Sequence, residues 1–161
     1  MANEQAFVTA AMNSWNSNLK AIDAYFAGKG DAGLNDEIAP GKNRLIYLMG
    51  HLAAVHDRMI PLLGLGDRLH PELDALFLSA KDREVEIPAT EDIRKKWTEI
   101  NGKLSSAMMA LSASDWLSRH ASVSEEDFAK EPHRNRYSVL MSRTSHLWYH
   151  YGQMVLAPKA T

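Results

Sequence analysis

The segment VTAAMNSWNSNLKAIDAYF (residues 8–26) indicates the fold class of this 161-residue chain. Its large apolar residues recur at steps of four and three, the spacing of a helix with one buried face. They are Val8, Met12, Trp15, Leu19, Ile22 and Phe26. Gly28 and Gly30 follow and are expected to end the helix. The segment therefore predicts a long helix that packs against other helices.

Three further segments show the same helical periodicity. One runs from about Lys42 to Leu63, one begins near Thr90 as the predicted N-cap, and one runs from about Asn135 to Leu156. About 25 residues separate the second helix from the third, more than a simple helical hairpin needs. We find no strand pattern, repeat or low-complexity tract. We therefore predict an all-α fold, a four-helix bundle with long connections, as a single domain over residues 1–161.

Short helical turns are expected inside the long connections. The stretch HPELDALFL (residues 70–78) has the composition of a short helix. Ser112-x-x-Asp115 and Ser124-x-x-Asp127 each resemble the first turn of a helix, with the serine as N-cap and the aspartate three residues later.

The bulk composition excludes several classes of function. The net charge of -2 gives no footprint for a polyanion, so we expect no nucleic-acid partner. The first residues lack the basic and apolar regions of a signal peptide, and no run of about 18 apolar residues exists to cross a membrane. With no cysteine, any metal must be bound by histidine or carboxylate side chains. The prediction is a cytoplasmic protein.

Two histidines near the C-terminus, His146 and His150, are four residues apart in SHLWYHYGQM (residues 145–154). On a helix this spacing places them about 40° apart around the axis and ~6 Å apart along it, so both imidazoles can reach one cation. No glutamate stands between them, unlike the H-E-x-x-H pattern. They are either packed aromatic residues or two ligands of a metal site. A third ligand would decide between these interpretations.

His51 is the candidate for that third ligand. It lies in LMGHLAAVH (residues 48–56) on the apolar face of the second predicted helix. A buried neutral imidazole needs hydrogen-bond partners, which a neighbouring side chain or the backbone can supply. Metal sites in helix bundles, however, are built from side chains that project inward from facing helices. Gly50 would permit a partner helix or ligand to approach closely.

The other histidines fit a single ion less well. His56 is rotated about 140° from His51 on the same helix, so we expect it and Asp57 at a flank of the helix or behind the ligands. The connecting segments hold three more that are expected to be solvated, His70, His120 and His133.

The two histidine-bearing motifs, LMGHLAAVHD (residues 48–57) and HLWYHYGQ (residues 146–153), resemble those of the DinB/YfiT-like superfamily of bacterial four-helix-bundle proteins. The resemblance covers nearly the whole chain. It implies that His51, His146 and His150 bind a divalent metal, commonly nickel or zinc, and that the protein is a homodimer. Characterised relatives use a low-molecular-weight thiol (bacillithiol, mycothiol or glutathione), which they transfer to electrophiles or use in isomerisation.

Further side chains are candidates for supporting this site. Gln153, about 20° from His146, is expected to orient a ligand imidazole. A charged guanidinium near the site would suit an anionic group of a substrate or cosubstrate, although such side chains also extend into solvent at the edge of a bundle. The tyrosines beside the site either donate a hydrogen bond or simply pack. These candidates are Arg44, Arg143, Tyr47 and Tyr149.

Trp148 and Val155 are predicted on the face of the fourth helix opposite His146. A helix that is apolar around much of its circumference needs partners on more than one side. A homodimer interface or cover from the long connections would supply them.

Three functions remain open from the sequence. The first is a metal-dependent enzyme of the thiol-transferase type, in which a three-histidine site activates a thiol or water toward a small electrophilic substrate. The second is a small metal-dependent hydrolase. The third is a non-catalytic, stress-associated bundle that binds a metal or a small molecule.

Overall fold

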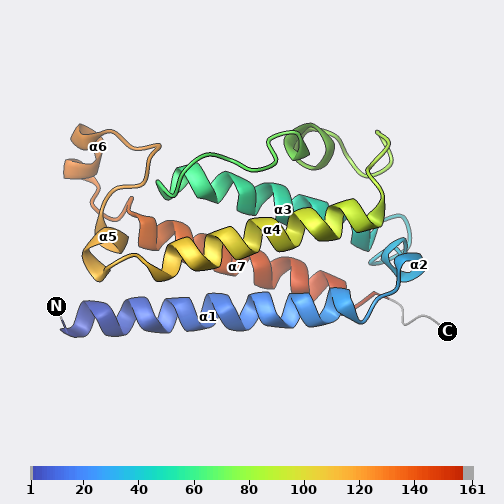
Figure 1. Cartoon of the computed structure of the whole chain (residues 1–161), viewed down its shortest axis with the longest axis horizontal. Helices are drawn as coiled ribbons and strands as arrows, with labels where there is room; N and C mark the ends of the chain where they lie inside the picture. The colour runs from blue at the N-terminus through green and yellow to red at the C-terminus, as the bar shows by residue number, and fades with distance from the viewer. Residues whose placement is uncertain (1, 158–161) are drawn as a thin grey trace.

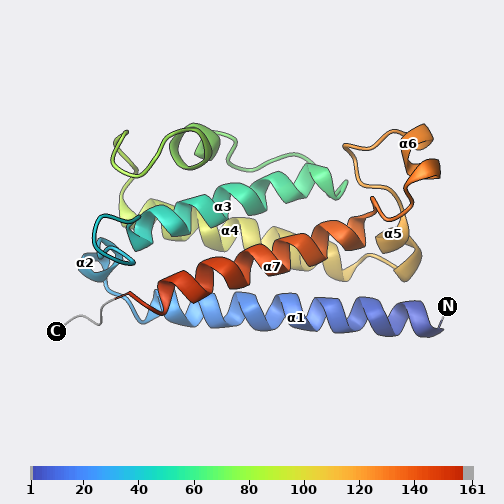
Figure 2. The same ribbon diagram turned by 180° about the vertical axis from the view of Figure 1, so that it is seen from behind.

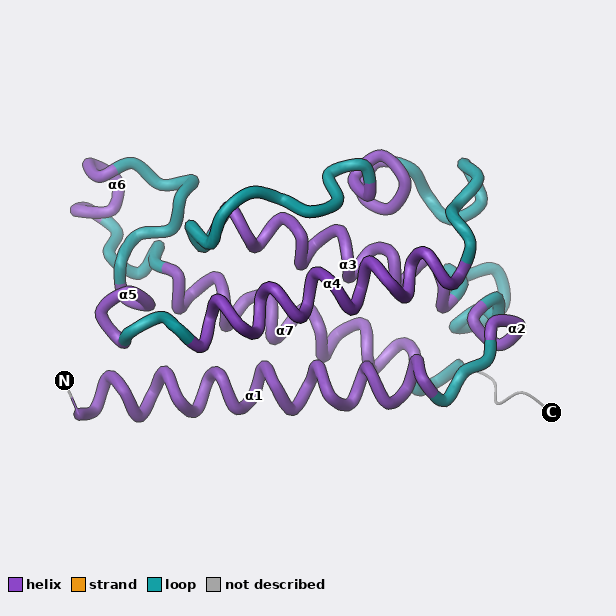
Figure 3. The backbone as a smooth tube through the Cα atoms, in the orientation of Figure 1, coloured by secondary structure: helices purple, strands orange, loops and turns teal. Residues whose placement is uncertain are grey.

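Four long helices of the computed structural model lie side by side (Figures 1 and 3). They are α1 (Ala2–Ala27), α3 (Leu45–Leu62), α4 (Thr90–Met109) and α7 (Arg136–Met154). The structure describes residues 2–157, and within that range it contains helices but no strand. The all-α prediction is thereby confirmed. No helix in the described part of the chain is long and apolar enough to span a membrane.

The direction of the helices explains the longest connection. α1 and α7 run in the same direction, whereas α3 and α4 both run in the opposite one (Figures 1 and 2). α1 packs mainly on α7, and α3 packs mainly on α4. Because α3 and α4 are parallel neighbours, the chain must return along the length of α3 before α4 begins. Residues 63–89 make this return and lie beside α3.

The shorter elements fill the connections. They are α2 (Asp31–Leu34), the π-helix η1 (Ala75–Ser79), α5 (Ala113–Leu117) and α6 (Glu125–Lys130). η1 overlaps the stretch HPELDALFL (residues 70–78) that is expected to be a short helix. α2 lies in the connection between the first two predicted helices and is not predicted from the sequence, since four residues are too few to show a helical period.

The helix N-termini test the capping predictions. The side chains of Ser112 and Ser124 accept hydrogen bonds from the backbone N–H groups three residues later, as predicted. Thr90 is not an N-cap. The helical hydrogen bonds begin one residue earlier, where the Ile93 N–H donates to the carbonyl of Ala89, so Ala89 occupies the capping position.

η1 is packed directly onto the backbone of α3. At Gly50 an added Cβ would lie only 2.4 Å from the ring of Phe77, a distance that carbon atoms do not tolerate. Phe77 is fully buried, and its ring also lies 5.7 Å from that of Tyr47. Gly50 therefore permits the close approach that sequence inspection anticipated, and the approaching group is Phe77.

α3 is buried around almost its whole circumference, since α4, α7 and η1 all contact it. His56 and Asp57 are each 0% exposed. Of the two positions expected for them, a flank of the helix is therefore excluded, and a position behind the ligands stays a prediction. The return segment that covers α3 removes the flank that a helical wheel alone suggests.

Candidate metal centre

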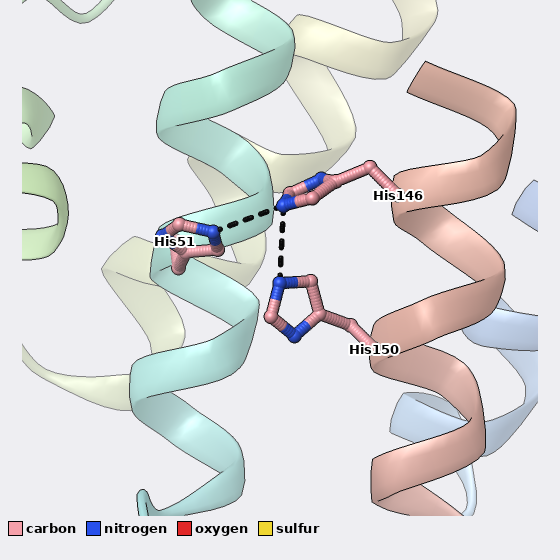
Figure 4. Close-up of side chains that lie close together, drawn as sticks. All are labelled: His51, His146 and His150. Atoms are coloured by element: carbon pink, nitrogen blue, oxygen red, sulfur yellow. Dashed lines mark hydrogen bonds between the residues drawn. The ribbon is translucent and has the colours of Figure 1, made fainter. Parts of the chain in front are cut away.

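Three histidines from two helices meet at one point between α3 and α7 (Figure 4). The Nε2 atom of His146 lies 3.3 Å from Nε2 of His51 and 3.1 Å from Nε2 of His150. One ligand atom from each ring lies within 4.8 Å of the others. The sequence-predicted set is thus brought together, although His51 and His146 are 95 residues apart in the chain.

The packing of the helices leaves room for these rings. α3 and α7 contact each other much less than the pairs α1–α7 and α3–α4 do, and the imidazoles lie between their backbones. His150 is 9% exposed, whereas His51 and His146 are half-buried. The nitrogen atoms are therefore held by the core and yet remain reachable from outside.

The ring of His51 is oriented by η1. Its Nδ1 lies 3.0 Å from the carbonyl oxygen of Phe77, which can only accept, so Nδ1 carries the proton and Nε2 presents a lone pair. Tyr47 donates from its hydroxyl to the carbonyl of Ala80 at 2.8 Å and approaches that of Phe77 at 3.4 Å. Tyr47 thus anchors the segment that orients His51.

His150 is oriented by Gln153 on the next turn of α7. Its Nδ1 lies 2.8 Å from Oε1 of Gln153, and Nε2 of that amide donates to the hydroxyl of Tyr149 at 3.1 Å. The arrangement fixes the protonated Nδ1 and again leaves Nε2 with a lone pair. The sequence anticipated that Gln153 would orient an imidazole, and the imidazole is that of His150.

The electrostatics of the cluster favour a cation. With lone pairs on Nε2 of both His51 and His150, the single remaining Nε2, that of His146, can donate a proton to only one of them. A divalent ion at the centre satisfies all three lone pairs at once.

The pKa values keep two of the rings neutral near pH 7. Burial, then the neighbouring His150, His51 and Arg143, lowers the pKa of His146 to about 4. Burial, then His51, lowers the pKa of His150 to about 4, although the Gln153 hydrogen bond acts in the opposite direction. Neutral imidazole is the form that binds a metal ion.

The donor set fits a borderline transition metal. Imidazole nitrogens bind zinc at about 2.0–2.1 Å, so two ligands of one ion at about 95–105° lie roughly 3.0–3.3 Å apart. The two Nε2 separations at His146 have these values. Three nitrogens without a carboxylate suit nickel, zinc, cobalt or copper better than magnesium or calcium, and they leave a position open for a further ligand.

The two candidate arginines have different surroundings. Arg44, the N-cap of α3, forms a bidentate ion pair with Asp82, at 2.7 Å from Nη2 and 3.0 Å from Nε to Oδ1. Arg143 has no carboxylate partner among the described residues, and it lies on α7 one turn before His146. Burial, then the charge on Arg58, lowers the pKa of Arg143 from its ordinary value.

Arg143 lines a cleft of about 310 Å³ between the end of α3, the start of α7 and the segment around α5 and α6. The lining includes Leu62, His120, His133 and Ser142. Of these histidines, His133 is exposed and His120 is half-buried. The cleft therefore adjoins the turn of α7 that precedes the first of its two ligands.

His56 and His70 have partners of their own. Nδ1 of His56 lies 2.7 Å from Oδ1 of Asn101 on α4. His70 is half-buried between Glu72 and Glu99, at 3.3 Å and 2.9 Å from their oxygens. Neither joins the three-histidine cluster.

One group that orients a histidine could not be predicted from the sequence. The carbonyl of Phe77 orients His51, and a backbone acceptor leaves no mark in a sequence. The only signal was Gly50, which indicated a close approach to α3 but not the identity of the neighbour.

Comparison with protein-family models and with curated proteins finds no match to this chain.

Proposed function

We propose that the chain is a four-helix bundle of the DinB/YfiT-like type and a metal-dependent enzyme that transfers a low-molecular-weight thiol to a small electrophile. The convergence of three Nε2 atoms, from His51, His146 and His150, carries this proposal. When bound there, nickel or zinc would lower the pKa of a thiol that takes the open position, so that thiolate is present near neutral pH. The chain has no cysteine, so the sulfur comes from a cosubstrate.

The roles of the chain's own residues follow from their contacts. The three imidazoles hold the ion, and Phe77 and Gln153 orient two of them. Arg143, which lacks a carboxylate partner in the described part of the chain, attracts an anionic group of the cosubstrate or substrate in the adjoining cleft. In the reaction the thiol gives its proton to solvent, and its sulfur forms a bond to the electrophilic carbon. The bond from that carbon to the halide or to the epoxide oxygen breaks, and the halide or oxygen keeps the electron pair.

We also propose that the protein is a homodimer in the cytoplasm. α7 exposes Met141, Trp148 and Val155 at seven-residue spacing, with exposures of 42%, 48% and 48%. This spacing forms one stripe along the helix, which a second copy would cover. The cytoplasm keeps low-molecular-weight thiols reduced.

A small metal-dependent hydrolase is the second candidate, and one residue favours it. His120 lines the same cleft as Arg143, and burial, then the charge on Arg134, lowers its pKa from the ordinary value. A neutral imidazole in that position suits a general base for water.

The experiment begins with metal analysis of purified, tag-free protein. We expect about one nickel or zinc ion per chain in the wild type. The loaded protein is then assayed with bacillithiol, mycothiol and glutathione, each against a panel of halogenated and epoxide electrophiles, and separately with ester and amide substrates.

The outcomes separate the three functions. Thiol-dependent turnover that is weakened in Arg143→Gln but not in His120→Gln supports the thiol transferase. Hydrolysis that is lost in His120→Gln points to the hydrolase. A loaded protein without turnover leaves the non-catalytic bundle, and a wild type that takes up no ion refutes the metal centre.

A further inference from the structure

Six side chains of the described protein carry buried polar atoms without a hydrogen-bond partner, among them Nε of Arg136 and of Arg143, and the other four are uncharged side chains around the candidate metal centre. The atoms of these four are Nε1 of Trp15, Nδ2 and Oδ1 of Asn18, Nε2 of His56 and Nδ1 of His146. We call these four residues the polar layer. Trp15, Asn18 and His56 are each 0% exposed. Buried polar groups in folded proteins are nearly always paired with protein or with ordered water, so a layer of this kind points to a ligand.

The members of the polar layer come from three helices that pack on one another. The ring centroids of Trp15 and His56 are 4.9 Å apart. Asn18 follows Trp15 by one turn on the same buried face of α1, which packs along α7. His51 precedes His56 by five residues on α3, and its Nε2 lies 3.3 Å from Nε2 of His146, so His146 lies beside the part of α3 that carries both histidines.

The donors and acceptors of the polar layer complement one another. Asn101 donates to the carbonyl of Trp97 at 2.8 Å, so its Oδ1 accepts from Nδ1–H of His56 and leaves His56 Nε2 as an acceptor. The indole of Trp15 can only donate, and the amide of Asn18 offers both functions. When Nε2 of His146 binds the proposed ion, the proton of this neutral ring is on Nδ1, which is then a further donor. Water, which accepts two and donates two hydrogen bonds, matches this mixture.

One ligand of the candidate centre therefore differs from the other two. His51 is held by the carbonyl of Phe77 and His150 by the amide of Gln153, whereas Nδ1 of His146 has no partner in the described protein. Metal-ligating histidines almost always donate their second nitrogen to an acceptor that fixes the ring.

We propose that the polar layer binds internal water, and that Asn18 and His56 thereby hold Nδ1 of His146 and position the third ligand. The proposal rests on the metal centre proposed above. In this arrangement a water molecule accepts from Nδ1–H of His146 and donates to His56 Nε2 or Asn18 Oδ1. Asn18 and His56 are positioning residues, which act on the ion only through His146.

The test compares the same substitution at two positions of α1. Asn18→Leu keeps the size of the side chain and removes both polar functions of the layer, whereas Asn16→Leu makes the identical change on the exposed face. We expect the Kd for zinc, measured by competition with a chromophoric chelator, to rise about 10–100-fold in Asn18→Leu and to stay at the wild-type value in Asn16→Leu. An Asn18→Leu protein that folds and binds zinc as tightly as the wild type overturns the proposal.

A crystal structure of the wild type decides the matter if Asn18→Leu does not fold. Density for water within hydrogen-bond distance of both Asn18 and Nδ1 of His146 supports the proposal, and a dry layer refutes it. The same crystals also separate the two proposals, when they are soaked with zinc. If water occupies the polar layer but no zinc binds, the metal centre and the positioning role of Asn18 are refuted, whereas the water site is confirmed.

Discussion

His51 and His56 lie five residues apart on α3 and have opposite environments. His51 is half-buried, and its ring lies with two other imidazoles between α3 and α7. His56 is 0% exposed between the indoles of Trp15 and Trp97, with ring centroids 4.9 Å and 5.3 Å away. The first imidazole is directed at a possible ligand, and the second is part of the core.

The contrast shows what separates a ligand from a structural histidine. Both rings have Nδ1 bonded to a fixed oxygen, that of Phe77 for His51 and that of Asn101 for His56. The difference lies at Nε2, which faces converging nitrogens in one ring and the buried polar layer in the other. The direction of the free nitrogen is thus more informative than burial or the presence of a partner.

The largest expected effect is the loss of metal from His51→Ala. Removal of one of three ligands should weaken zinc or nickel binding by more than about 100-fold, since even a residue behind the ligands costs about 10–100-fold. The free energy of unfolding of the metal-free protein should change by less than about 1 kcal/mol. Isothermal titration calorimetry and urea denaturation measure the two quantities. His70→Ala is the matched control, and wild-type affinity in His51→Ala would contradict the assignment.

His56→Ala should lower stability much more than His51→Ala does. Loss of a fully buried ring between two indoles leaves a cavity and an unpaired Asn101 oxygen, so we expect the free energy of unfolding to fall by about 3 kcal/mol. The folded fraction should still bind one ion per chain, with a weaker affinity because His56 helps to position His146. Urea denaturation and metal analysis test this. A variant that is as stable as the wild type but binds no metal would show that His56 is a ligand and not a core residue.

Gly50→Ala tests the link between η1 and His51. A Cβ 2.4 Å from the Phe77 ring must push η1 away from α3, at a cost of about 1–3 kcal/mol, and should also weaken metal binding because the carbonyl that orients His51 moves. Gly102→Ala on α4, where an added Cβ meets nothing within 4 Å, should instead stabilise the protein by about 0.5–1 kcal/mol. Equal stability of the two variants would show that the Phe77 contact is dispensable.

The last comparison concerns pH. Burial lowers the pKa of His56 to about 3 from an unfolded value near 6.5, so the unfolded state binds more protons between these pH values. The free energy of unfolding should therefore fall as the pH decreases through this window. The lowered pKa values of His146 and His150 act in the same direction. The contribution of His56 is therefore measured by comparing the wild type with His56→Leu in urea denaturation at several pH values. Identical pH dependence in both proteins would exclude a contribution from His56.

The sequence predicted the helices and the three-histidine set better than it predicted the surroundings of that set. Helical periodicity is a local property, which is why the four long helices were found to within a few residues at most ends. The sequence made Arg44 a candidate for the site, but it could not reveal that Asp82, 38 residues away, pairs with the guanidinium. The same limitation left two positions for His56, at a flank or behind the ligands, since a helical wheel does not include the return segment that covers α3.

The partners of the imidazoles also differ in how far they could be predicted from the sequence. Gln153 lies on the same helix as His146 and His150, so its role could be predicted from its angle to His146, although the imidazole that it contacts is that of His150. Phe77 contacts His51 from η1, and Asn18 is proposed to act on His146 from α1; no local pattern connects either residue with these histidines. Contacts between distant segments depend on how the helices pack, which a single sequence does not record.

The span of the chain between His51 and His146 has a consequence for the whole molecule. An ion bound by both residues would close a loop of 95 residues in a protein that has no cysteine. In the chain-entropy model, a permanent cross-link around a loop of about 100 residues contributes roughly 4–5 kcal/mol by restricting the unfolded chain. The metal would thus act as a removable cross-link, and the free energy of unfolding would depend on the supply of the ion.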